Sequence, residues 1–110
     1  MNLFRKTINL KRVVVTGLGA ISPLGRTAAE SWKKARAGAN GVGRISRFDA
    51  SQYYSQVAGE VKDYDPLEYF DRRELRKYDP FIQFALIAAE DAYRDSGLAE
   101  GKFDPTLVHC

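Results

Sequence analysis

Two patterns of apolar residues along the chain predict strands. Residues 13–15 are all valine and end at Thr16, and an unalternating β-branched run is typical of a strand covered on both faces, as in a parallel sheet. In 56–61, Val57, Gly59 and Val61 alternate with the residues between them, which predicts a strand with one buried face. Gly59 indicates a close neighbour on that face. A further strand is predicted to begin at 106–108.

A third apolar pattern predicts a long helix near the end of the chain. Asp79 and Pro80 are a typical N-cap and first helical residue, and the helix is expected to run to Ser96 and stop at Gly97. Apolar residues occupy nearly its whole circumference. We therefore expect a buried helix that packs against other elements on more than one side.

Shorter elements fill the rest of the chain. Thr27 and Glu30 form a capping box that starts a helix over 28–37, and Gly38 can take the left-handed conformation that closes it. Residues 38–55 are predicted to be a loop. A turn or short helix is expected over 65–70, and a second short helical stretch, dense in charge, over 71–78.

Composition limits the class of protein. The 110 residues suffice for one small domain, and 45% apolar with 28% charged residues is ordinary for a globular sequence. We expect residues 1–10 to be a leader and 11–110 to be one domain, which is incomplete because its last strand stops short. The net charge of +3 suits an acidic protein, a nucleic acid or no particular partner.

The cysteine content bears on metals, cofactors and location. Cys110 is the single cysteine, so the chain offers no internal disulfide and no metal-ligand cluster. A reducing cytoplasmic location fits this, and no apolar run reaches the roughly 18 residues that span a bilayer. We expect no metal, no cofactor and no membrane association.

The glycine turn after the first strand raises one alternative. Gly17-Leu18-Gly19 resembles the start of the G-x-G-x-x-G loop of dinucleotide-binding domains, but Ser22 stands at the third glycine and Pro23 follows it. A lone G-x-G is weak support for nucleotide binding. We favour the simpler interpretation that the glycines make a tight exit from the strand.

A cluster of basic residues is the strongest surface feature. Arg72, Arg73, Arg76 and Lys77 occupy about 140° of a helix circumference. The residues alone favour a solvated helix face. Nucleic-acid binding would require interleaved stacking aromatics or a known motif, and no such motif is present.

Four segments resemble the β-ketoacyl-acyl-carrier-protein synthases of the condensing-enzyme family, in order and spacing. They are VVVTGLGAISPLG at 13–25, RFDAS at 47–51, AGEVKDYDP at 58–66 and DRRELRKYD at 71–79. The resemblance covers about 11–105. It implies an α/β fold, the amino-terminal portion of the thiolase-like αβαβα arrangement, in which the long helix lies between two sheets.

The resemblance also implies a function. Such enzymes load an acyl chain on a cysteine and condense it with malonyl carried by the acyl carrier protein, using two histidines, and as full-length proteins they are homodimers. In the family these three residues lie beyond position 110, so we expect no catalytic residue in this chain. Basic residues at the positions of Arg73, Arg76 and Lys77 dock the acidic carrier protein in the family.

Two further points follow from the resemblance. His109 and Cys110 are not expected to form the active site, because neighbours on a strand point to opposite faces and no helix follows the cysteine. The leading hypothesis is the amino-terminal part of a fatty-acid-elongating synthase. The alternatives are a non-catalytic carrier-protein-binding module of the same family and a nucleotide-binding domain.

Overall fold

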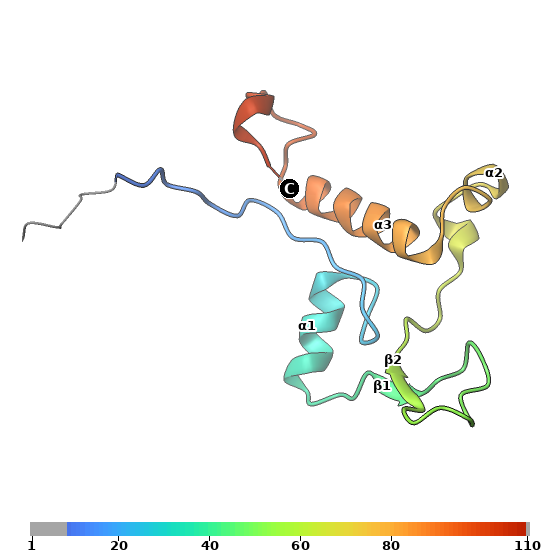
Figure 1. The fold of residues 1–110 in the computed structure, drawn as a ribbon. Helices are drawn as coiled ribbons and strands as arrows, with labels where there is room; N and C mark the ends of the chain where they lie inside the picture. Colours follow the sequence, from blue (N-terminus) through green and yellow to red (C-terminus); the bar gives the residue numbers. More distant parts are fainter. Residues whose placement is uncertain (1–8, 110) are drawn as a thin grey trace, which may run out of the picture.

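Helix α3 (Pro80–Asp95) is the longest element. In Figure 1 the first helix and the strand pair lie below it, the short helix α2 (Arg72–Leu75) lies near its start, and the C-terminal segment lies above its end. The computed structural model describes residues 9–109. Along the chain the remaining elements are α1 (Ala28–Arg36), β1 (Val42–Arg44), β2 (Val57–Gly59), the 3₁₀ helix η1 (Pro66–Glu68), α2 (Arg72–Leu75) and the 3₁₀ helix η2 (Pro105–Leu107). The described part of the chain is thus a mixed α/β structure.

Helix α1 forms as its end signals predict. The Thr27 hydroxyl accepts a hydrogen bond from the Glu30 N–H at 3.1 Å, and Gly38 takes a φ of 74° after the last turn. The Glu30 carboxylate also reaches back, but it accepts from the Arg26 N–H at 3.0 Å rather than from Thr27. The prediction is confirmed except that the helix ends at Arg36 instead of residue 37.

Strands β1 and β2 form an antiparallel pair in which Val42 lies opposite Gly59 and Arg44 opposite Val57. Predicting 38–55 as a loop was therefore wrong for β1. Three residues are too few to show an alternating pattern, and the pairing depends on a partner 13 or more positions away. β2 confirms the second predicted strand but ends at Gly59.

The face of β2 that was predicted to be buried is exposed. Val57 is 55% exposed and shares its face with Val42, which is 53% exposed. The close neighbour expected at Gly59 is nevertheless present. A Cβ on Gly59 would lie 3.1 Å from the Cγ of Pro23, in the turn over 22–25 that packs beside the sheet.

Two predicted strands do not form. Residues 13–16 are exposed and unpaired, with Val13 at 88% and Val15 at 80%, because no segment within 9–109 offers them a hydrogen-bonding partner. Residues 106–108 were also predicted as a strand. The Asp104 carboxylate accepts from the Thr106 N–H at 2.9 Å, and with Pro105 at the first position it starts η2 instead.

Helix α3 begins and ends where predicted, but its expected burial is wrong for the described structure. Ser96 is its C-cap and Gly97 takes a φ of 71°, while the side chain of Asp79 makes no capping hydrogen bond. Its buried residues are Gln83 and Ile87, and Phe81 is 70% exposed. An all-round apolar helix needs cover on every side, and residues 9–109 supply it on only part of the circumference.

The described structure is open. Its radius of gyration is 19.9 Å, whereas a compact domain of about 100 residues has about 13 Å. Its accessible surface is 9979 Å², against about 6,100 Å² for a compact monomer of this mass. Within residues 9–109 the buried apolar residues are Ala50 and Ile87, and neither is completely inaccessible to solvent.

No helix in the described range is both long and apolar enough to cross a membrane.

Candidate functional site

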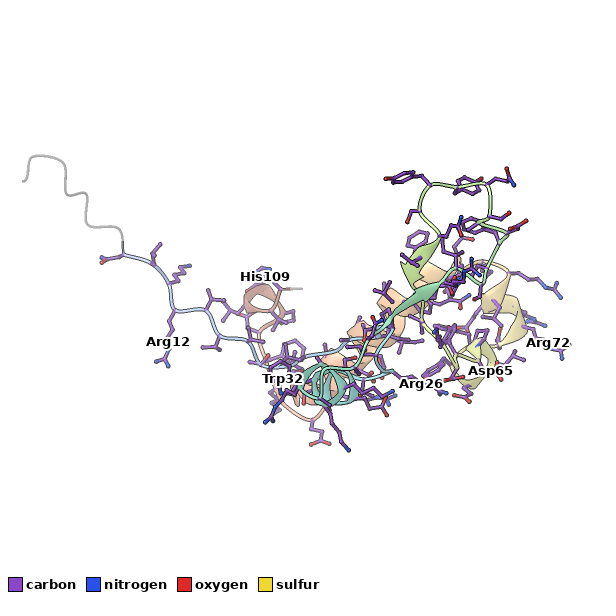
Figure 2. All side chains as sticks on the ribbon, turned by 90° about the horizontal axis from the view of Figure 1, so that it is seen from below. Arg12, Arg26, Trp32, Asp65, Arg72 and His109 are labelled. Carbon is purple, nitrogen blue, oxygen red and sulfur yellow. The ribbon has the colours of Figure 1, made fainter. Side chains whose placement is uncertain are left out.

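The basic cluster lies on α2 and the two residues that follow it, at one extremity of the molecule. Figure 2 shows Arg72 at the outer edge, pointing away from the other elements. Arg73, Arg76 and Lys77 are likewise exposed. We call the surface formed by Arg73, Arg76 and Lys77 the basic face. Residues 65–77 carry it, and we call them the docking segment after the role that the sequence predicts for them.

A capping box turns the acidic side chains of α2 toward its own backbone. The Asp71 carboxylate accepts hydrogen bonds from the Arg73 and Glu74 N–H groups at 2.7 and 2.8 Å, and the Glu74 carboxylate accepts from the Asp71 N–H at 2.9 Å. Neither acid pairs with the basic side chains, and among the described residues none of the three cations is in an ion pair. Their charge is therefore available to an external partner.

The aromatic residues around the basic face pack on one another. Phe70 and Tyr78 meet edge to face with ring centroids 6.0 Å apart, and Tyr64 packs edge to face on Phe84 at 5.1 Å. A single-stranded nucleic acid would need open ring faces beside the cations. Here these four rings are engaged with one another, which disfavours a nucleic acid that binds by stacking.

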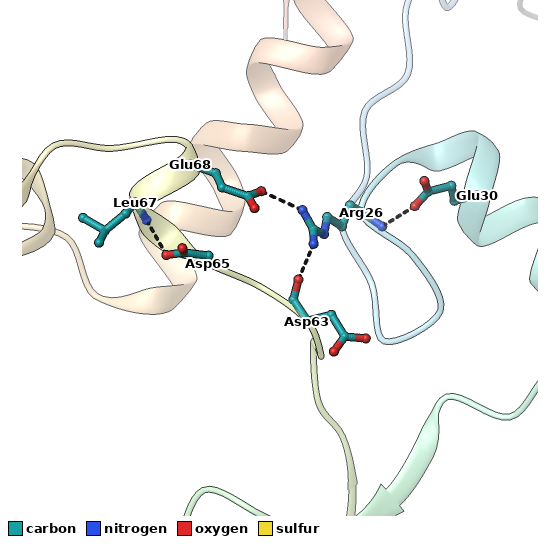
Figure 3. A network of polar contacts seen from close by, with 6 residues as sticks. All are labelled: Arg26, Glu30, Asp63, Asp65, Leu67 and Glu68. Carbon is teal, nitrogen blue, oxygen red and sulfur yellow. Dashed lines mark hydrogen bonds and ion pairs between the residues drawn. The ribbon is translucent and has the colours of Figure 1, made fainter.

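Arg26 ties the docking segment to the first half of the chain (Figure 3). Its guanidinium group pairs with the Glu68 carboxylate at 2.7 Å and donates to the main-chain oxygen of Asp63. Asp63 has a φ of 54°, in the left-handed region that residues other than glycine rarely adopt. The Arg26 contact thus holds the chain at the sharp change of direction before η1.

The paired glycines contact helix α3 closely, which explains them without a nucleotide. A Cβ on Gly17 would lie 2.6 Å from the Ser96 nitrogen, and one on Gly19 would lie 2.7 Å from the Ala92 nitrogen. The Leu18 N–H donates to the Asp95 carboxylate at 2.9 Å. The glycines therefore face the backbone of α3, whereas dinucleotide binding requires them at a helix N-terminus.

The remaining predicted residues contribute no further site in the described range. His109 is exposed after η2, and Cys110 lies outside the described residues. Between residues 9 and 109, no group of three His, Cys, Asp or Glu side chains is arranged to hold a metal ion.

Sequence reasoning missed two residues that contact the docking segment or the residues next to it. One is Arg26, which has no sequence signal because its partners lie 37 and 42 positions away. The other is Gln83, whose signal was available: it is the one polar residue in the apolar run from Phe81 to Ala89.

Comparison with known proteins identifies the family to which the chain belongs. Residues 10–109 match the family described as beta-ketoacyl synthase, N-terminal domain, and the chain belongs to this family. The predicted fold class is confirmed by a solved structure of the ishigamide ketosynthase/chain length factor. That structure superposes with a TM-score of 0.71 at 36% identity over 84% of this chain and 23% of that one.

The names of the curated relatives specify one kind of synthase within this family. The chain is 49% identical over 88 residues to the 3-oxoacyl-[acyl-carrier-protein] synthase 2 of Coxiella burnetii, covering 80% of this chain. The protein of the same name from Synechocystis is 48% identical, and that of Vibrio harveyi is 46% identical. The chain spans only about 21% of the length of these relatives.

Proposed function

We propose that this chain is the amino-terminal part of a 3-oxoacyl-[acyl-carrier-protein] synthase and supplies its carrier-protein docking face. The observation that carries this proposal is the outward basic face of Arg73, Arg76 and Lys77, beside which both local acids are engaged by the α2 backbone. Its support from the comparisons is that the relatives' names specify an acyl carrier protein. Carrier proteins of this kind are acidic, so the charges are complementary.

The reaction itself is assigned to the longer protein. An acyl chain is transferred from its carrier thioester to a cysteine thiolate, which releases the carrier's thiol, and malonyl on a carrier protein then loses carbon dioxide. The resulting carbanion attacks the acyl thioester carbon, and the thiolate leaves. Two histidines stabilise the developing charge, and this chain contains a single His, so it cannot supply both. In this proposal residues 11–110 are an incomplete domain and the longer protein is a cytoplasmic homodimer that needs no cofactor.

A chimera tests the docking role in a complete enzyme. The matching 88 residues of the Coxiella burnetii synthase are replaced by those of this chain. The double reversal Arg73→Glu with Arg76→Glu is expected to weaken binding of holo-acyl carrier protein about tenfold at low salt, because two attractive contacts become repulsive. The difference shrinks at about 0.15 M salt, where charges are screened beyond about 8 Å.

The matched control uses two exposed basic residues on another helix. Lys33→Glu with Lys34→Glu changes the net charge by the same amount on α1, and carrier affinity is expected to change less than twofold. Equal losses from the two double variants would mean that only net charge matters, and unchanged affinity after reversal at Arg73 and Arg76 would overturn the proposal.

The chimera also separates the enzyme from a non-catalytic binding module. A module would bind carrier protein through the basic face but would not support condensation when placed in the relative. Condensing activity of the chimera, measured by release of carbon dioxide from malonyl-carrier protein, supports the enzyme. Carrier binding without turnover favours the module.

A further inference from the structure

One buried side chain connects the two ends of the docking segment. Gln83 lies in the first turn of α3 and is 6% exposed. Its side-chain oxygen accepts a hydrogen bond from the Tyr64 hydroxyl at 2.8 Å, and its side-chain nitrogen donates to the main-chain oxygen of Tyr78 at 2.8 Å. Tyr64 directly precedes the docking segment and Tyr78 directly follows it. A single amide group therefore closes this stretch of chain onto α3.

The chemistry of the partners allows only one orientation of the Gln83 amide. The main-chain oxygen of Tyr78 can only accept a hydrogen bond, so the nitrogen must face it. The amide oxygen is then left for the Tyr64 hydroxyl, which must donate. Burial raises the pKa of the Tyr64 hydroxyl above its ordinary value, so the group keeps its proton at neutral pH.

An amide at this position needs a reason beyond packing. Its neighbours Ile82 and Phe84 are apolar, and methionine would fill a similar volume without the desolvation cost of a buried amide. That cost is offset only if both ends of the amide are hydrogen-bonded, as they are. Within the described residues no buried side-chain nitrogen or oxygen lacks a partner. Both contacts of Gln83 end on the docking segment's flanks.

We propose that Gln83 is a positioning residue that closes the docking segment and holds Arg73, Arg76 and Lys77 in one arrangement for an acidic protein. The identity of that partner rests on the proposed function, whereas the closure rests on the two hydrogen bonds of Gln83. A surface that is already ordered loses less freedom on binding, and this raises affinity without any new contact.

Amide hydrogen exchange on the same chimera, in which the chain is part of a complete enzyme, tests the closure. Gln83→Met removes both hydrogen bonds, Tyr64→Phe removes one and keeps the ring packing, and Gln52→Met on an exposed loop is the control. Gln83→Met is expected to lower protection of the Phe70, Lys77 and Tyr78 amides about tenfold, and Tyr64→Phe about threefold, with α1 unchanged. Unchanged protection of these amides in both variants would overturn the inference.

Carrier binding by the chimera tests the link to the basic face. Gln83→Met is expected to weaken holo-acyl carrier protein binding about fivefold, although no charge is altered. Combined with Arg76→Glu, its loss should be smaller than the sum of the separate losses, because both act on one surface. Additive losses would show that Gln83 supports only the general stability of the fold and would overturn its positioning role.

The exchange and binding experiments together distinguish a failure of this inference from a failure of the proposed function. One outcome is that reversal at Arg73 and Arg76 leaves carrier affinity unchanged while Gln83→Met still exposes the amides of the docking segment. In that case the closure by Gln83 is supported, and the acyl carrier protein is not the partner of this surface. If reversal weakens binding while exchange is unaffected by Gln83→Met, the docking role stands and the positioning role fails. Should Gln83→Met not fold, Tyr64→Phe gives the same distinction with a smaller change.

Discussion

At the scale of single residues, the carboxylate of Glu60 holds the start of the loop over 46–55. It accepts hydrogen bonds from the Ser46 hydroxyl at 2.8 Å, the Ser46 N–H at 3.1 Å and the Arg47 N–H at 3.3 Å. These bonds, the Ser46 hydroxyl first, lower the pKa of Glu60 below its ordinary value. The loop is thus fastened to the residue that follows β2.

This geometry predicts how stability changes with pH. A carboxyl group whose pKa is lower in the folded state contributes stability above its unfolded pKa, and this is lost as pH falls through the folded value. Ser46→Ala should raise the pKa of Glu60 toward its ordinary 4.5 and flatten the loss of stability below about pH 4.5. An NMR titration of the Glu60 carboxyl carbon measures the shift, and an unchanged pKa would contradict the assigned cause.

Gly19 packs so closely against α3 that a side chain at this position has a predictable effect. A methyl group in its place would press on the Ala88 carbonyl oxygen and the Ala92 nitrogen, which belong to the rigid backbone of α3. Gly19→Ala is expected to lower the free energy of unfolding by about 3 kcal/mol and to expose the Leu18 amide to exchange. Gly101→Ala is the control, since its nearest contact would be an ordinary 3.6 Å. Equal effects would mean that close packing is not the reason for Gly19.

At the scale of elements, α2 depends on its cap because four residues cannot sustain a helix alone. Asp71→Ala removes the capping acceptor and is expected to cost about 1 kcal/mol and fray α2, whereas Asp71→Asn keeps an acceptor. The asparagine variant also removes a negative charge beside the basic face. We therefore expect Asp71→Asn to bind carrier protein as well as the parent or better, and Asp71→Ala to bind it more weakly, by titration calorimetry.

The sequence predicts elements well where their signals are local. The ends of α1 and α3 are specified by Thr27, Gly38, Pro80 and Gly97, each within a turn of the residue it affects. Strands are different, because a strand exists only with a partner. β1 was missed and 13–16 was predicted but stays unpaired for this same reason.

The candidate site shows the same division between local and distant information. The basic cluster is visible in the sequence because its members lie within six positions of one another. The contacts of Arg26 and Gln83 with the docking segment and its flanks are not visible in the sequence, because nothing in the sequence pairs these residues with their partners. Only the polar character of Gln83 within an apolar helix marked it as exceptional.

At the scale of the whole molecule, the described residues leave much apolar surface uncovered. Trp32 is 66% exposed, Phe81 70% and Leu107 75%, and the total surface is about 3,900 Å² larger than that of a compact monomer. The 110-residue chain alone is therefore expected to bind the dye ANS and to melt over a broad temperature range. A sharp, cooperative calorimetric transition of a purified monomer would contradict this expectation.

The contact between Leu18 and Asp95 has a consequence for how the chain is made. It joins residues 77 positions apart, so the glycine turn cannot reach its site until the end of α3 has left the ribosome. At about 5–20 residues per second, that wait lasts about 4 to 15 seconds. The valines at 13–15 directly precede this turn, so they emerge before it and remain exposed throughout the interval. In biosynthesis, the glycine turn is therefore placed well after it is made, and a chaperone that binds short apolar stretches has that interval in which to bind the valines beside it.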